Sequence, residues 1–240
     1  MTAARFDVCE CGRRGGSPPA GNDLVAAGCH ALRGPLTSLL AFSGFLADAG
    51  EGELTEEHRQ FVEIIRRSSE RVLALVNELD LLARLESGQL RLNLAPVSIP
   101  ELVRTVAADQ HSHSPAVVLR SESADGPPID GDQVHLQQML AALVLSRLEA
   151  AGPGGSVDLR AAPTSTGWQI ELTDSHPGLP DDQLNQLFTA FRRPAPERST
   201  GVSLAVSRAI AVSHGGTIQA ENTGSGTTVT VRLPWGRPGR

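Results

Sequence analysis

The sequence predicts a multidomain chain of α and α+β class, with a helical hairpin that forms a dimeric four-helix bundle and then an α/β sandwich. Three observations lead to this fold class. Two long amphipathic segments lie near the start, separated by a short glycine-rich turn. From residue 96 onward, shorter strand-like and helical segments follow one another. Strands interleaved with helices are typical of a sheet that carries helices on one face.

The first hairpin helix is expected to begin at Asn22 or Asp23, either of which is a good N-cap, and to end near residue 48. Its leucines recur at steps of three and four residues, the period of one helix face. Pro35 removes one backbone hydrogen bond, so we expect a bend just after His30.

The second helix is expected to follow Thr55 as its N-cap and to end at Gly88. Its apolar seam repeats in heptads, which is typical of a helix that packs in a bundle. The seam residues are Phe61, Ile65, Ser68, Val72, Leu75, Leu79 and Leu82. A single hairpin cannot cover this seam, so the sequence predicts a homodimer through the hairpin.

Three domains are predicted: a disordered Gly/Pro/Arg-rich tail over residues 1–21, the hairpin over 22–88, and the sandwich over 96–234. In the sandwich, Ser98 is expected to cap a short helix. The other expected elements are a strand at 116–121, a helix at 132–151, strands at 157–162 and 168–173, helices at 180–190 and 201–214, and a closing hairpin of 217–220 with 227–233.

The composition excludes two classes of function. A net charge of −6 argues against a nucleic-acid surface, and no apolar run is long enough to span a membrane. Residues 1–21 lack the apolar segment of a signal peptide, and three cysteines without an even pairing pattern suggest a reducing compartment. We therefore expect a cytoplasmic protein.

Three stretches carry candidate chemistry. His30 is a helical histidine, and imidazole is a nucleophile near neutral pH, although a helical histidine is usually an ordinary surface residue. Asp174 ends a predicted strand and is followed by Gly178; a carboxylate there can accept a hydrogen bond from an adenine amine, or belong to an ordinary turn. Residues 199–204 open a helix with small residues, which suits a phosphate or a simple N-cap.

The order and spacing of these segments resemble the transmitter core of sensor histidine kinases. His30-Ala-Leu-Arg-Gly-Pro-Leu-Thr is similar to the phosphoacceptor box His-Glu-Leu-Arg-Thr-Pro-Leu-Thr. Asp174 to Leu179 is similar to Asp-x-Gly-x-Gly-Ile, Leu187 to Phe191 resembles the Phe-containing box, and Ser199 to Leu204 resembles Gly-x-Gly-Leu-Gly-Leu. The resemblance covers about residues 22–234. It implies a Bergerat-type ATP-binding domain that passes phosphate to His30 and then to a response-regulator aspartate.

The same resemblance assigns the nucleotide pocket, with departures. Adenine contacts are implied at Asp174 and Gly178, and lid or phosphate contacts at Phe191, Gly201 and Ser203. Ser146 stands where an asparagine normally holds Mg²⁺, which leaves it a weak metal candidate. Further departures are Ala31 for the acidic residue after the histidine, Gly34 for threonine, Ala142 for the first asparagine, His176 for a glycine, and Glu149 for a basic residue. Arg147 is a candidate to offset the charge of Glu149.

We expect adenine recognition to survive and the handling of phosphate and Mg²⁺ to be weakened, because of Ser146, Glu149 and Ser203. The missing acidic neighbour of His30 removes general-base help, which is worth about 10²–10⁴-fold. Three functions stay open. The chain is a histidine kinase that phosphorylates His30 from ATP, a histidine phosphotransferase with a degenerate ATP domain, or a non-catalytic pseudokinase that binds signalling partners. The hairpin begins almost at once, so a separate sensor protein is an expected partner beside a response-regulator receiver domain.

Overall fold

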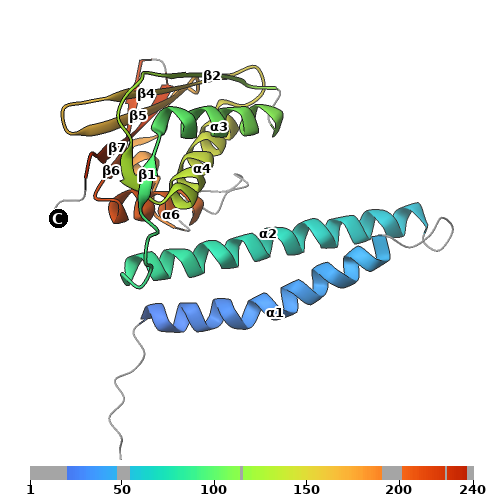
Figure 1. The fold of residues 1–240 in the computed structure, drawn as a ribbon. Helices are drawn as coiled ribbons and strands as arrows, with labels where there is room; N and C mark the ends of the chain where they lie inside the picture. Colours follow the sequence, from blue (N-terminus) through green and yellow to red (C-terminus); the bar gives the residue numbers. More distant parts are fainter. Residues whose placement is uncertain (1–20, 48–54, 114–115, 191–201, 225, 237–240) are drawn as a thin grey trace, which may run out of the picture.

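The computed structural model describes residues 21–47, 55–113, 116–190, 202–224 and 226–236. Two long helices lie side by side as a hairpin, and a sheet with its helices lies beside the second of them (Figure 1). The tail predicted over residues 1–21 lies outside the described residues except for Gly21, which begins the first helix.

The hairpin consists of α1 (Gly21–Ala47) and α2 (Glu56–Glu86). The hydroxyl of Thr55 accepts a hydrogen bond from the backbone N–H of His58 at 3.2 Å, so the predicted N-cap of α2 is confirmed. Helix α1 begins one or two residues earlier than expected and bends partway along its length (Figure 1).

Helix α2 uses two different faces. Val62, Ser69, Val76 and Ala83, spaced by seven residues, are buried within the single chain, where α2 packs against α1 and the second domain. The seam predicted from the heptads lies beside that face and is open in its first half, where Phe61 is 51% exposed. The seam is thus not used by the hairpin itself in this region.

A five-stranded sheet follows, made of β2 (Val118–Ser123), β4 (Ser156–Pro163), β5 (Gly167–Asp174), β6 (Thr217–Thr223) and β7 (Gly226–Pro234). Its strand order is β2-β4-β5-β7-β6, with β2 parallel to β4 and the other neighbours antiparallel. A separate small pair joins β1 (Ala95–Val97) to β3 (Ile129–Gly131), which the sequence did not predict. Strand β5 is therefore central, and its carboxyl end lies inside the domain.

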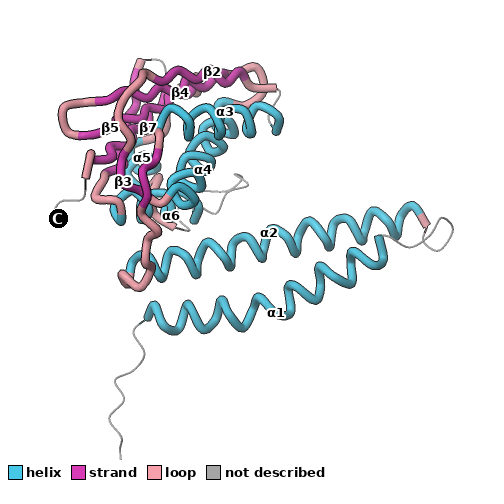
Figure 2. Tube along the Cα trace, viewed as in Figure 1, coloured by secondary structure: helices cyan, strands magenta, loops and turns pink. Residues whose placement is uncertain are grey.

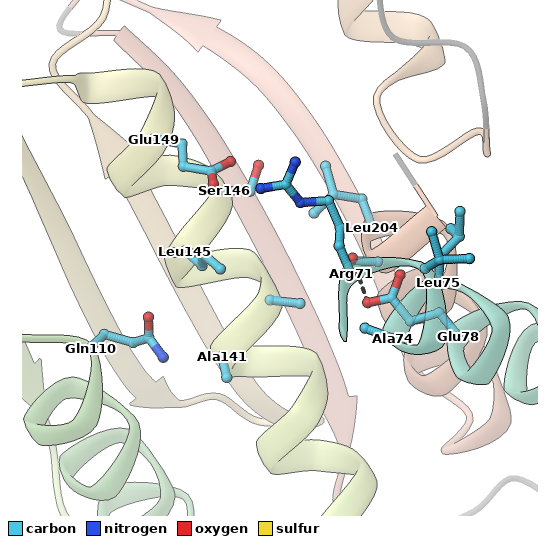
Figure 3. A pocket seen from close by; sticks show the side chains of 13 residues that line it. Arg71, Ala74, Leu75, Glu78, Gln110, Ala141, Leu145, Ser146, Glu149 and Leu204 are labelled. Atoms are coloured by element: carbon cyan, nitrogen blue, oxygen red, sulfur yellow. Dashed lines mark hydrogen bonds between the residues drawn. The ribbon is translucent and has the colours of Figure 1, made fainter. Parts of the chain in front are cut away.

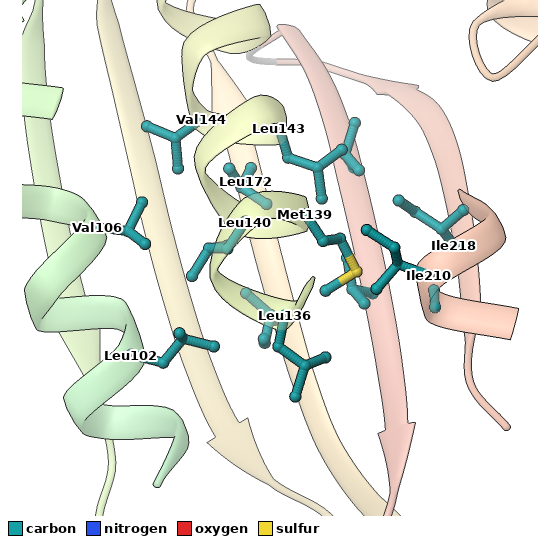
Figure 4. Packing of buried hydrophobic residues seen from close by; sticks show 14 of the residues in the cluster. Leu102, Val106, Leu136, Met139, Leu140, Leu143, Val144, Leu172, Ile210 and Ile218 are labelled. Atoms are coloured by element: carbon teal, nitrogen blue, oxygen red, sulfur yellow. The ribbon is translucent and has the colours of Figure 1, made fainter. Parts of the chain in front are cut away.

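The longer helices cover one face of this sheet (Figure 2). They are α3 (Ile99–His113), α4 (Gln133–Ala151) and α6 (Val202–Ser213). Ser98 caps α3, which is longer than expected, whereas α5 (Asp181–Gln186) covers only part of the helix predicted over 180–190. The core lies between these helices and the strands, centred on α4 (Figure 4). The predicted fold class is confirmed.

Asp132 connects three parts of the second domain. Its carboxylate caps α4 by accepting the backbone N–H of His135 at 3.2 Å, and it also accepts the N–H of Asn93 at 2.9 Å. Its own N–H donates to Nε2 of His214, at the end of α6, at 3.0 Å. Burial alone would raise the pKa of Asp132, but the backbone N–H groups of Asn93 and His135, together with the side chain of His135, outweigh it and hold the pKa below its ordinary value of 3.8.

Asp132→Ala is expected to lower the free energy of unfolding by about 1–3 kcal/mol at neutral pH, because an N-cap and a buried acceptor are lost together. A carboxylate with a lowered folded pKa stabilises the fold above 3.8, the unfolded value, and this contribution is lost as the pH falls through the folded pKa. Urea unfolding across that pH range should show that the difference in the free energy of unfolding between Asp132→Ala and the wild type becomes smaller in acid. Asp130→Ala, at an exposed position, serves as the control.

Candidate functional site

The carboxylate of Asp174 lies at the end of β5 and is fully engaged within the protein. One oxygen accepts the backbone N–H of His176 at 3.0 Å and that of Thr227 at 3.4 Å. The other accepts Nη1 of Arg147 at 2.9 Å. The side chains of this ion pair are 0% and 1% exposed. Each member of this buried ion pair holds the other in place, because an unpaired charge in the interior would be costly in free energy.

Arg147 reaches a second predicted site residue. Its Nη2 donates to the hydroxyl of Ser146, the preceding residue of α4, at 3.2 Å. We expected Arg147 to offset the charge of Glu149, and this expectation is wrong. The guanidinium points into the domain at Asp174, whereas Glu149 lines a cavity on the other side of α4.

The arrangement does not fit Mg²⁺. Ser146 was the weak metal candidate, and its hydroxyl is in contact with a guanidinium, which would repel a second cation. Within the described ranges, no group of three or more His, Cys, Asp or Glu side chains is placed to hold a metal ion.

Gly178 lies in the loop after Asp174 with a φ of +97°, a conformation that residues with a β-carbon rarely adopt. The loop is held by Asn222 of β6, whose side chain accepts from the backbone N–H of Leu179 at 3.0 Å and donates to its carbonyl at 2.7 Å. Asn222 was not among the predicted site residues. Its role depends on a contact 43 residues away, which no local pattern shows.

Ser203, expected at the phosphate position, instead contacts the hairpin. Its hydroxyl donates to a carboxylate oxygen of Glu78 in α2 at 2.7 Å. The sequence reasoning did not identify Glu78 either, because this bond joins residues 125 positions apart. Phe191 and Gly201, the other predicted residues of this region, lie outside the described residues.

A cavity of about 450 Å³ lies between α2, α4 and α6. Its walls are mostly apolar, and three charged side chains line it: Arg71 and Glu78 from α2, and Glu149 from α4. Figure 3 shows Arg71 extended from α2 toward Ser146 and Glu149, across the cavity. A phosphate entering here would be attracted by Arg71 and repelled by the two carboxylates. Arg71 was missed because its role depends on how the two domains pack.

Burial raises the pKa of Glu78, with the bond from Ser203 opposing the shift. A carboxyl with a raised folded pKa destabilises the fold at neutral pH, and this effect disappears as the pH falls below 4.5, the unfolded value. Glu78→Gln keeps an acceptor for Ser203, so we expect the midpoint of thermal unfolding to rise by about 1–3 °C at neutral pH. This gain in the unfolding midpoint should vanish in acid. The control Glu86→Gln, at an exposed position on the same helix, should leave the midpoint unchanged at both pH values.

His30 lies within α1, and its side chain is outside the described part of the chain. Its neighbour Cys29 is 4% exposed, and burial, with a smaller effect of Asp80, raises the pKa of its thiol. A reactive cysteine needs the thiolate, so this environment favours a packed residue over a redox-sensitive one.

Comparison with known proteins assigns both halves of the chain. Residues 21–88 match the family described as the His Kinase A (phospho-acceptor) domain, and residues 131–237 match the histidine kinase-, DNA gyrase B- and HSP90-like ATPase family. The sensor histidine kinase ZraS of Escherichia coli strain K12 is 31% identical over 215 residues, which cover 88% of this chain and 45% of ZraS. The chain spans 30–45% of the length of the curated relatives it matches first.

Solved structures support the same relationship. The full-length ShkA in complex with AMPPNP superposes with a TM-score of 0.79 at 25% identity, covering 91% of this chain and 47% of ShkA. The histidine kinase AdeS of Acinetobacter baumannii superposes with a TM-score of 0.62 at 26% identity, covering 86% of this chain and 98% of that one. In the part of the chain that the structure describes, no helix is both long and apolar enough to cross a bilayer.

Proposed function

We propose that this chain is a histidine kinase core, a phospho-acceptor domain joined to a kinase-type ATPase domain, and that it acts in two-component signalling. In this proposal His30 takes a phosphoryl group from ATP and passes it to an aspartate of a response-regulator receiver domain. The observation that carries the proposal is the match of residues 21–88 to the phospho-acceptor domain, because that match includes His30 and its proline-containing motif.

The proposed chemistry consists of two transfers. A ring nitrogen of His30 attacks the γ-phosphorus of ATP, so that an N–P bond forms while the bond to the ADP oxygen breaks. The receiver aspartate then attacks the same phosphorus, an O–P bond forms and the imidazole leaves. Ala31 offers no carboxylate to take the imidazole proton in the first step, and a missing general base slows such a step by about 10²–10⁴-fold. We therefore propose slow autophosphorylation.

The domain organisation belongs to the same proposal. Residues 22–88 would form the dimerisation and phosphotransfer hairpin, and residues 96–234 the ATPase-like domain. A second copy is the proposed partner of the exposed hairpin seam. The cysteine usage is in keeping with a cytoplasmic setting.

A second candidate function is favoured by one observation. Asp174 is paired with Arg147 inside the domain, so the adenine end of the pocket is closed as it stands. A histidine phosphotransferase would use His30 in the same way and would need no nucleotide, because it would exchange phosphate between two receiver domains.

The two candidates are separated by the source of phosphate. The chain is incubated with radiolabelled ATP and Mg²⁺, quenched without acid because phosphohistidine is acid-labile, and then mixed with a receiver domain. The proposal expects slow labelling of the chain, followed by transfer of the label to the receiver. Labelling from a phosphorylated receiver but never from ATP would favour the phosphotransferase. If neither donor labels the chain, both candidates fail and a non-catalytic role is left.

A further inference from the structure

We infer that Arg147 is the residue that sets the nucleotide affinity of the ATPase-like domain, because its guanidinium occupies the position at Asp174 where a purine amino group would bond. This inference rests on the proposed function, since it concerns the pocket from which ATP would be used. It goes further in naming a residue of this chain as the determinant of binding.

The hydrogen bonds of Asp174 carry the first step of the argument. Two backbone N–H groups and one guanidinium donate to its carboxylate, and the side chain is 0% exposed. A donor from outside, such as the amino group of adenine, therefore has no access to this carboxylate while Arg147 is bonded to it. Arg147 must leave before such a ligand can bind at this carboxylate.

The second step comes from the shape of the neighbouring cavity. The cavity of about 450 Å³ reaches Ser146, yet among the described residues neither Arg147 nor Asp174 lines it. This cavity therefore ends at Ser146, and the buried Arg147–Asp174 pair lies beyond its wall. The guanidinium of Arg147 connects the two regions, because it bonds Asp174 and also donates to the hydroxyl of Ser146, in the cavity wall, at 3.2 Å.

Moving Arg147 away from Asp174 costs free energy. Separating a buried ion pair leaves two charges without partners in a medium of low polarity, so the open state is a minor one. The apparent affinity for a nucleotide equals the intrinsic affinity multiplied by the fraction of molecules in the open, binding-competent state. Because that fraction is small, the apparent affinity is low. Arg147 thereby weakens ATP binding without touching the nucleotide.

The test compares ATP binding by the full chain and its variants in calorimetric titrations with Mg²⁺ present. Arg147→Ala is expected to bind ATP about tenfold or more tightly than the wild type, because the closed state is removed. It should prefer ATP to inosine triphosphate, which has a carbonyl oxygen where adenine has its amino group. The double variant Arg147→Ala with Asp174→Asn opens the same space without the carboxylate, so the gain and the preference should both be lost.

Two controls keep the result interpretable. Arg120→Ala removes an arginine from an exposed pair with Asp158 and should leave binding at the wild-type level. If Arg147→Ala does not fold, Arg147→Gln replaces it, because its amide still donates to Asp174 but carries no charge; a smaller gain in the same direction is expected. A folded variant, of either kind, that binds ATP no better than the wild type overturns the inference.

The outcomes also separate this inference from the proposed function. Tighter ATP binding by Arg147→Ala with no phosphate on His30 would support the inference and remove the kinase proposal. Labelling of His30 from ATP in the wild type, together with unchanged affinity in Arg147→Ala, would support the proposal and overturn the inference.

Discussion

His30→Gln is expected to abolish phosphoryl uptake by this chain completely, from ATP and from a phosphorylated receiver domain alike. Glutamine keeps a polar side chain of similar size, but its amide is not a nucleophile, so the N–P bond cannot form. The substitution lies in the middle of α1, where glutamine is a good helix former, so the fold should be retained. The measurement is incorporation of label under alkaline conditions, with circular dichroism as the test of folding.

His58→Gln is the matched control for this experiment. His58 lies exposed in the first turn of α2, and the same chemical change there should leave labelling at the wild-type level. Residual label in His30→Gln, equal to that of the wild type, would mean that another residue accepts the phosphate and that the resemblance of the phosphoacceptor motif misleads.

Ile65→Lys is expected to convert the protein from a dimer to a monomer. Ile65 belongs to the heptad seam of α2 and is 47% exposed in the single chain; Phe61 and Val72, on the same seam, are 51% and 43% exposed. Helix α1 adds a further set of exposed apolar side chains, namely Leu32, Leu39, Phe42 and Leu46. Exposed apolar residues on both helices form a surface that a second hairpin would cover.

The expected effect on association is large. Each copy would lose the burial of one large apolar side chain, about 1.5–3 kcal/mol, and would place a lysine in the interface. Across two copies this amounts to about 4 kcal/mol or more, roughly a thousandfold in the dissociation constant. Sedimentation or light scattering at several concentrations gives the oligomeric state.

The control for the dimer experiment is Gln60→Lys, which adds the same charge at an exposed position beside the seam. It should remain a dimer. A wild-type protein that is monomeric at high concentration would contradict the bundle, whatever the variants do.

Much of the fold follows from local signals. Thr55 was read from the sequence as an N-cap, and α2 begins where it predicts. The helix predicted over 132–151 is α4, although its cap Asp132 was not identified as one. The pair of β1 and β3 was missed, because three-residue strands carry no periodic pattern and form only when Ala95 and Gly131 are brought together. The helix over 180–190 was overestimated, since its polar composition does not show where its hydrogen bonds stop.

The site was less predictable, because its central contacts join distant residues. Asp174 was chosen from its place at a strand end, but its partner lies 27 residues earlier. One signal for that partner was present. Leu140, Leu143 and Val144 are buried on one face of α4, and steps of three and four from them place Arg147 on that same face. An arginine at a core position should prompt a search for a buried carboxylate.

Peptide mass spectrometry at neutral to alkaline pH can locate the phosphate that is proposed to pass through His30. The chain is treated with ATP and Mg²⁺, or with a phosphorylated receiver domain, and digested without acid. We expect a single acid-labile phosphate on the α1 peptide, at His30, from at least one of these donors. An α1 peptide free of phosphate after both treatments, or a phosphate mapped to another residue, would contradict it.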